Sequence, residues 1–251
     1  MKFIWPVFKY IYWLWAIILM FLFLVTSVVY SAIVLLIFRK NAQPFLIAFY
    51  KFWGNTFCIG TFIHVKIHNK HIVKAASPCI IVSNHCSNID MFLGAIGLPY
   101  SSKPLGKIEL KKIPLLGYLF SVGAILVDRK SRESREKSIF RIRQEIKKGN
   151  NVFIYPEGTR NQTDKPLRDF YDGAFRFAIE SNSPLVVMIS INAKQIVPAN
   201  GLYLRPGKID LHYLPVYETK ELNQNDIQQL KQQVYNDMET FILKHDPAFQ
   251  K

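Results

Sequence analysis

The sequence predicts an α/β protein in which one domain, a mixed sheet flanked by helices, follows an N-terminal membrane-embedded helix or helices. No charged residue occurs from Tyr10 to Phe38, and a transmembrane helix needs only about 20 apolar residues. Behind this stretch, short apolar runs of strand type alternate with helical patterns, which is typical of an α/β domain. The 251 residues suffice for one such domain with an appendage. We place the anchoring segment at residues 1–58 and the domain at residues 59–251.

The apolar stretch is bracketed by Lys9 and by Arg39-Lys40, and it is rich in aromatic residues of the kind that favour membrane interfaces. It is too long for a signal peptide and has no clear cleavage site. The cations that follow it, together with Lys51 and the basic domain, favour a cytoplasmic position for the C-terminal side. Full crossing and half insertion both remain open. Residues 41–60 place aromatic side chains at helical steps, which predicts an amphipathic helix on the membrane surface or packed against the domain.

Hydrophobic periodicity and breaker residues predict the remaining elements. Strands are expected at residues 62–68, 79–83, 124–127, 152–155, 184–191 and 209–216. Helices are expected after Asp90, within residues 107–120 with an interruption at Pro114, over residues 132–148 and along the apolar stripe from Ile227 to Phe241. Together these elements predict the alternation on which the fold class rests.

The formal net charge of +14 and the isoelectric point of about 9.7 indicate acidic partners. An anionic membrane lipid or a phosphorylated substrate fits this charge, whereas no nucleic-acid-binding module is visible, so we expect no nucleic acid partner. The cysteines Cys58, Cys79 and Cys86 form no Cys-x-x-Cys pair. This pattern is typical of a reducing compartment and argues against a disulfide framework or a structural zinc site.

The most informative stretch runs from Asn84 to Asp90, where an apolar strand gives way to a helix. On one continuous helix, His85 and Asp90 would point about 140° apart, but across a turn they can meet. A carboxylate that accepts the proton of one imidazole nitrogen leaves the other nitrogen free as a base. As an alternative, Ser87-x-x-Asp90 is a weakened capping box, which explains Asp90 without catalysis but does not explain His85. Cys86 is a poor candidate nucleophile because adjacent residues usually point apart.

The stretch Asn84-His85-x₄-Asp90 resembles the first motif of the glycerolipid acyltransferases, the family that includes the 1-acyl-sn-glycerol-3-phosphate acyltransferases. Three further blocks follow in the family's order, and a segment between the first two also matches. These are Gly123–Arg129, Tyr155–Arg160, Pro184–Val187 and the intervening Lys107–Gly117. The resemblance covers roughly residues 60 to 217. A His-x₄-Asp motif alone is a weak signal, but followed by Pro-Glu-Gly-Thr-Arg it is specific.

The resemblance implies a membrane-bound O-acyltransferase that moves a fatty acyl group from acyl-CoA or acyl carrier protein to lysophosphatidic acid, giving phosphatidic acid in phospholipid biosynthesis. His85 is expected to act as the base and Asp90 to orient it. No covalent enzyme intermediate is required, because the alcohol can attack the thioester directly, and no metal or cofactor is expected. Six residues are expected to bind substrate, with Lys107 a candidate donor to the acyl carbonyl and the others at the acceptor's phosphate: Lys107, Arg129, Glu157, Gly158, Thr159 and Arg160.

Each of three of these residues also has an explanation that involves no substrate. Arg129 belongs to a basic run that suits a solvated or membrane-facing patch, Glu157 suits a structural partner of an arginine, and Lys107 suits an ordinary exposed lysine. The family often has a lysine just ahead of the glycine aligned with Gly173, where this chain has Tyr171-Asp172. It also often has a second proline at the position of Val187. Both departures leave the acceptor open, to another lysophospholipid or an amino-acid lipid.

Two other classes compete with an acyltransferase. A non-catalytic membrane protein that binds anionic lipid would need no His–Asp pair. A lipid hydrolase would use water in place of the alcohol, and the chain has no Gly-x-Ser-x-Gly motif of a serine hydrolase.

Overall fold

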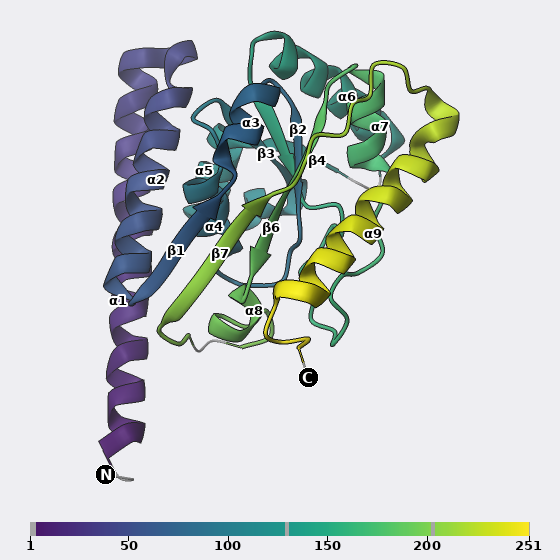
Figure 1. Cartoon of the computed structure of the whole chain (residues 1–251). Helices are drawn as coiled ribbons and strands as arrows, with labels where there is room; N and C mark the ends of the chain where they lie inside the picture. The colour runs from purple at the N-terminus through teal and green to yellow at the C-terminus, as the bar shows by residue number, and fades with distance from the viewer. Residues whose placement is uncertain (1–3, 129–130, 202–203, 251) are drawn as a thin grey trace.

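The computed structural model describes residues 4–128, 131–201 and 204–250, and its centre is a seven-stranded sheet (Figure 1). The strand order is β1-β7-β6-β2-β5-β3-β4. The strands are β1 (Ile63–His68), β2 (Ile80–Ser83), β3 (Ser102–Lys107), β4 (Ile125–Val127), β5 (Asn151–Ile154), β6 (Leu185–Ile191) and β7 (Gly207–Tyr213). Neighbouring strands run parallel except β6 and β7, so the predicted mixed sheet is confirmed.

Helices cover both faces of the sheet, as expected for central strands whose residues are buried throughout, such as β2 and β6. Helices α6, α7 and α9 pack on one face, and α3 and α4 lie on the other with α2 outside them. The helices are α1 (Ile4–Phe38), α2 (Gln43–Gly60), α3 (Lys70–Ala76), α4 (Asp90–Gly97), α5 (Leu116–Gly123), α6 (Arg132–Lys147), α7 (Gly173–Glu180), α8 (Ala193–Ile196) and α9 (Ile227–His245), with 3₁₀ turns at Arg39–Asn41, Ile108–Lys112 and Gln224–Asp226.

Helices α1 and α2 form an antiparallel pair along one side of the domain (Figure 1). The part of α1 from Tyr10 to Phe38, with a hydropathy of 2.6, is long and apolar enough to cross a membrane. Tyr12 Oη donates to Thr61 O at 2.6 Å and Trp15 Nε1 to Gly60 O at 2.8 Å. Two of the aromatic residues expected at a membrane interface thus satisfy carbonyl groups at the end of α2. The division at residue 58 stays a prediction.

Helix α2 is amphipathic as predicted, and it packs against the domain, which was one of the two predicted alternatives. One face packs inward: Phe57 stacks on Phe92 of α4 at 4.4 Å, and a Cβ atom on Gly54 would lie 3.0 Å from the Ile96 side chain. The opposite face leaves Phe52 61% and Ile59 73% exposed. The helix therefore joins the domain and still presents apolar side chains outward.

Four elements were not predicted from the sequence, namely β3, α3, α7 and α8. Strand β3 contains Pro104 and Gly106, both unfavourable in strands, yet it pairs on both sides, with β5 and β4. The three helices have eight residues or fewer, too short for a helical period to stand out. These four elements are formed because of their contacts with neighbouring elements, and the local sequence pattern does not predict them.

Candidate active site

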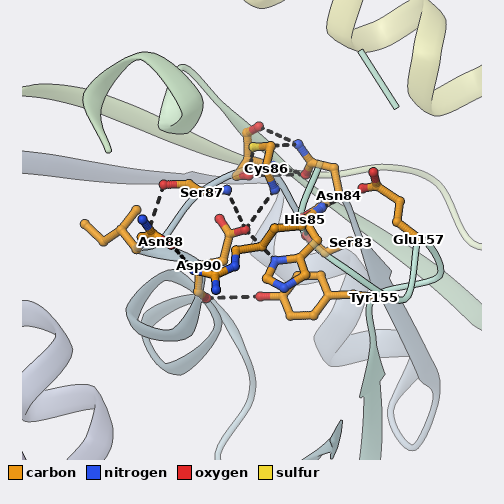
Figure 2. A network of polar contacts seen from close by, with 12 residues as sticks. Ser83, Asn84, His85, Cys86, Ser87, Asn88, Asp90, Tyr155 and Glu157 are labelled. Carbon is orange, nitrogen blue, oxygen red and sulfur yellow. Dashed lines mark hydrogen bonds and ion pairs between the residues drawn. The ribbon is translucent and has the colours of Figure 1, made fainter. Parts of the chain in front are cut away.

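The carboxylate of Asp90, the first residue of α4, is the centre of the turn that follows β2. Its Oδ2 atom accepts hydrogen bonds from His85 Nδ1 at 2.7 Å and from the backbone N–H groups of Cys86 and Ser87, both at 2.9 Å (Figure 2). Because a carboxylate only accepts, Nδ1 of His85 carries the hydrogen and Nε2 is left with a free lone pair. His85 and Asp90 therefore meet across the turn in the arrangement of a base and its orienting group.

The predicted capping box is wrong in detail, because α4 begins at Asp90 with Ile89 as its N-cap, but the Asp90 carboxylate still binds the backbone of the turn as well as His85. The carboxylate that orients the imidazole also accepts the Ser87 N–H, as the acidic residue of a capping box does. Ser87 Oγ accepts the Ile89 N–H at 3.2 Å and donates to Val197 O. Among the described residues, the buried Oδ1 atom of Asp90 accepts no hydrogen bond. One side chain thus shapes the turn and fixes the ring that the turn presents.

Tyr155, which directly follows β5, packs its ring on one face of the His85 imidazole. Its ring stacks on His85 with centroids 4.0 Å apart and an angle of 17°, and its hydroxyl donates to Asp90 O at 3.1 Å (Figure 2). Tyr155 begins the motif Tyr155–Arg160, but the sequence predicted no role for it. An aromatic residue at the end of a strand neighbouring β2 was the available signal, since parallel strands end at one edge of the sheet.

Glu157 lies beneath the turn and is only 1% exposed. Its carboxylate accepts the His85 N–H at 2.7 Å and the Arg168 N–H at 3.0 Å. Burial raises the pKa of Glu157 to about 7, although both backbone donors favour the charged form. Asn161 donates its N–H to His85 O at 2.6 Å, so the His85 backbone is bound at both its N–H and its carbonyl.

The next residues of this loop run outward. Gly158 has a positive φ of 69°, which favours glycine, and its N–H donates to Tyr155 O at 3.0 Å. Thr159 and Arg160 are exposed. The Arg160 guanidinium donates to Asn88 Oδ1, and Asn88 in turn donates from Nδ2 to Pro198 O at 2.8 Å and to Gly201 O at 2.9 Å. Arg160 therefore lies against the turn that carries His85, through an asparagine that the sequence analysis did not single out.

Of the two other predicted site residues, the structure describes only Lys107, and none of its described contacts reaches this turn. Lys107 is the last residue of β3. Because β2, β5 and β3 run parallel, it lies at the same end of the sheet as the carboxyl end of β2. Its side chain is 54% exposed and pairs with Glu109 at 3.4 Å. Arg129 lies outside the described residues.

A cavity of about 610 Å³ lies between the turn and α1. Asn88 and Arg160 line it together with apolar side chains of α1, among them Trp13, Ile17 and Met20. The apolar N-terminal helix thus supplies one wall of a cavity whose polar wall is continuous with the His85 turn.

All three cysteines are buried free thiols. Burial, together with the nearby Asp90 carboxylate, raises the pKa of the Cys86 thiol well above its ordinary value. A thiol that stays protonated is a poor nucleophile, which agrees with the low rank given to Cys86 in the sequence analysis.

Known proteins are similar to this chain in sequence and in fold. A chloroplastic 1-acyl-sn-glycerol-3-phosphate acyltransferase of Brassica napus is 28% identical over 205 residues, which cover 76% of this chain and 59% of that protein. The beta form of the human 1-acyl-sn-glycerol-3-phosphate acyltransferase is 26% identical over 183 residues, covering 72% of this chain and 66% of the human protein. The chain thus spans about 60% of the length of these relatives.

The crystal structure of PlsC, the 1-acyl-sn-glycerophosphate acyltransferase of Thermotoga maritima, superposes with a TM-score of 0.78 over 95% of this chain and 96% of that one, at 18% identity. This likeness confirms the fold along nearly the whole chain, including the N-terminal helices. The model of the Acyltransferase family matches residues 64–192, just over half of the chain and the part that holds His85, Asp90 and Arg160. The chain therefore belongs to the Acyltransferase family.

Proposed function

We propose that the protein transfers a fatty acyl group from a thioester to the free hydroxyl of lysophosphatidic acid and so forms phosphatidic acid. The observation that carries this proposal is the bond from His85 Nδ1 to Asp90 Oδ2, which leaves Nε2 free to accept a proton, in a chain of the Acyltransferase family. The relatives named 1-acyl-sn-glycerol-3-phosphate acyltransferase supply the substrate assignment.

In the proposed mechanism, His85 Nε2 takes the hydroxyl proton as the acceptor oxygen attacks the thioester carbonyl carbon. Asp90 stabilises the imidazolium that forms, as the carboxylate of a catalytic triad does. When the tetrahedral intermediate collapses, the carbon–sulfur bond breaks and the leaving thiolate takes the proton from His85. Tyr155 and Glu157 act on His85 rather than on the substrates, because one stacks on its ring and the other binds its backbone N–H.

The acceptor's phosphate is assigned to Arg160, because a guanidinium binds phosphate oxygens in two places and this one is exposed beside the turn. Gly158 and Thr159 bring the backbone of the same loop to the phosphate. Glu157 belongs to the turn instead, since a buried carboxylate occupied by two N–H donors offers nothing to an anion. Roles for Arg129 at the phosphate and for Lys107 at the acyl carbonyl stay predictions.

The cavity against α1 suits the lipid part of a substrate. Its wall on the α1 side is apolar, and the same helix is long and apolar enough to enter a membrane. We therefore propose that α1 lies in the membrane and that the substrate's chain lies between α1 and the domain. The cations that follow α1 favour a cytoplasmic position for the domain. The formal charge of +14 suits an anionic lipid surface and an acidic donor, either acyl-CoA or acyl carrier protein.

Purified protein in detergent tests this function directly. We expect thiol release from acyl-CoA to depend on lysophosphatidic acid and to yield phosphatidic acid. Equal thiol release without an acceptor would indicate a hydrolase, and none with any lysolipid would indicate a non-catalytic lipid-binding protein. Preference for another lysophospholipid or an amino-acid lipid would keep the chemistry and replace the acceptor.

Variants at the pair test the mechanism. His85→Ala should lower kcat by about 10²–10⁴-fold, the usual contribution of a positioned base. Asp90→Asn should also lower it, because an amide can bind the other imidazole tautomer and carries no charge. His71→Ala, an exposed histidine of α3, is the matched control and should stay fully active. Activity of His85→Ala within about tenfold of the wild type would refute the assignment.

A further inference from the structure

Three side chains with metal-binding groups gather on the face of the sheet opposite α4. His68 ends β1, and Asp210 and His212 lie two residues apart on the neighbouring β7, where His68 is paired with His212. One nitrogen or oxygen atom from each of the three lies within 4.8 Å of the others. Leu211 and Tyr213 alternate with them, and Tyr213 Oη donates to Gly97 O of α4. The alternation of β7 thus separates this cluster from the proposed active site.

The polar contacts inside the cluster are short and specific. His68 Nε2 and Asp210 Oδ1 are 2.6 Å apart, and the imidazole rings of His68 and His212 stack with centroids 4.2 Å apart and an angle of 2°. On the side of α9, Phe241 lies 5.0 Å from the His212 ring. All three members of the cluster are half-buried, so an ion can reach them from solvent.

We propose that His68, Asp210 and His212 bind one divalent transition-metal ion of the zinc type. Two imidazoles and one carboxylate are a donor set that suits zinc and its neighbours in the first transition row, and not magnesium or calcium. The ion would replace the hydrogen between His68 Nε2 and Asp210 Oδ1, and these two atoms, 2.6 Å apart, would have to separate to bond to it. The χ2 torsions of histidine are broad, so both rings can turn from their stack to bring a nitrogen to the ion.

The second carboxylate oxygen of Asp210, Oδ2, forms an ion pair with Lys208. Lys208 Nζ lies 3.0 Å from Asp210 Oδ2 and is 55% exposed, and it stays there when the ion binds at Oδ1. The positive charge of Lys208 repels the ion and so weakens its binding, but the lysine does not occupy the position of the ion at Oδ1. Because β1 is an edge strand of the sheet and joins the domain to α2, the ion would fasten this edge to β7.

The test uses full-length, untagged, metal-free protein in detergent, titrated with Zn²⁺ by calorimetry and with Co²⁺ by visible absorption. We expect saturable binding of one ion per chain and a rise in melting temperature that a chelator reverses. His212→Ala and Asp210→Asn should each weaken binding by at least about 100-fold, since losing even an outer partner of a ligand costs about 10–100-fold. His71→Ala should bind as the wild type does.

Lys208→Met should increase the affinity for Zn²⁺, a result that a misfolded variant would not give. Removing a unit charge near a divalent ion should tighten Zn²⁺ binding roughly tenfold. Circular dichroism of each metal-free variant checks that its fold is retained. The proposal is overturned if the wild type shows no saturable binding, if His212→Ala binds as tightly as the wild type, or if Lys208→Met binds no more tightly.

Discussion

At the scale of single residues, the turn between β2 and α4 depends on carboxylates that accept more than one hydrogen bond. Asp90 Oδ2 accepts three, one from a ring nitrogen and two from the backbone, and Glu157 accepts two from the backbone. A carboxylate is suited to this because it has about four lone-pair sites and no hydrogen to place. The geometry of the proposed catalytic pair is thus built from the same contacts that shape the loop.

Arg160 is predicted to act on the acceptor and not on the chemistry. Arg160→Ala should raise the KM for lysophosphatidic acid by roughly ten- to a hundred-fold, as expected for a charge-assisted hydrogen bond of about 1.5–3 kcal/mol, with a smaller effect on the donor. Arg160→Lys should recover little, because an ammonium cannot bind two phosphate oxygens at once. Steady-state kinetics with each substrate varied in turn measure this. An equal loss with a monoacylglycerol acceptor, which has no phosphate, would show that Arg160 does not recognise phosphate.

Glu157 is predicted to make the folding stability depend on pH. Its pKa of about 7 lies above the ordinary 4.5, so between these values the folded protein binds more protons than the unfolded chain, and stability falls as the pH rises. The shift corresponds to a loss of the order of 3 kcal/mol, at about 1.4 kcal/mol per pKa unit. Glu157→Gln removes the ionising group, so its unfolding free energy should change less between pH 5 and pH 8. Denaturant titrations at both values measure this, and equal pH dependence of the two proteins would contradict it.

At the scale of elements, α2 fastens the N-terminal pair to the helix that begins with Asp90. Lys51 is buried on α2 and donates from Nζ to Ile96 O at 3.2 Å and to Leu98 O, both at the C-terminal end of α4. A cation at this end also complements the helix dipole. Since Asp90 is the first residue of α4, the packing of α4 on α2 helps to set the position of the proposed catalytic pair.

Lys51→Met tests this contact. The methionine fills the space but leaves both carbonyl groups without their donor, which should lower the unfolding free energy by about 1–3 kcal/mol. Lys74→Met, an exposed lysine in the last turn of α3, is the matched control and should be neutral. Denaturant unfolding in detergent measures both variants. A Lys51→Met protein as stable as the wild type would show that the lysine does not fasten α4.

At the scale of the whole molecule, α1 serves both the membrane and the domain. It supplies apolar side chains to the cavity beside Arg160, and Phe23 packs on Phe92 of α4 at 5.1 Å. The aromatic face of α2 and the basic residues remain when α1 is removed. Attachment and activity should therefore depend on α1 to different degrees.

Deleting residues 1–40 should loosen membrane attachment without abolishing it, and should also lower activity because the cavity loses a wall. Basic residues near an anionic surface contribute about 1 kcal/mol each, and salt screens them. The truncated protein should then be washed off membranes by high salt, whereas the full-length protein should need detergent. Fractionation of membranes after each wash measures this. Release of the full-length protein by salt alone would contradict insertion of α1.

The sequence by itself determined the α/β class, the apolar helix, most strands and the order of the motifs, because these depend on local hydrophobic period and on neighbours along the chain. It also predicted that His85 and Asp90, which lie within six residues, could meet across a turn, as they do. The tertiary structure alone decided what lies against them. Tyr155 reaches His85 and Glu157 reaches its backbone because β5 pairs with β2, and strand pairing leaves no trace in either segment. For the same reason, only the parallel pairing of β1 with β7 brings His68 to Asp210 and His212, across more than half of the chain.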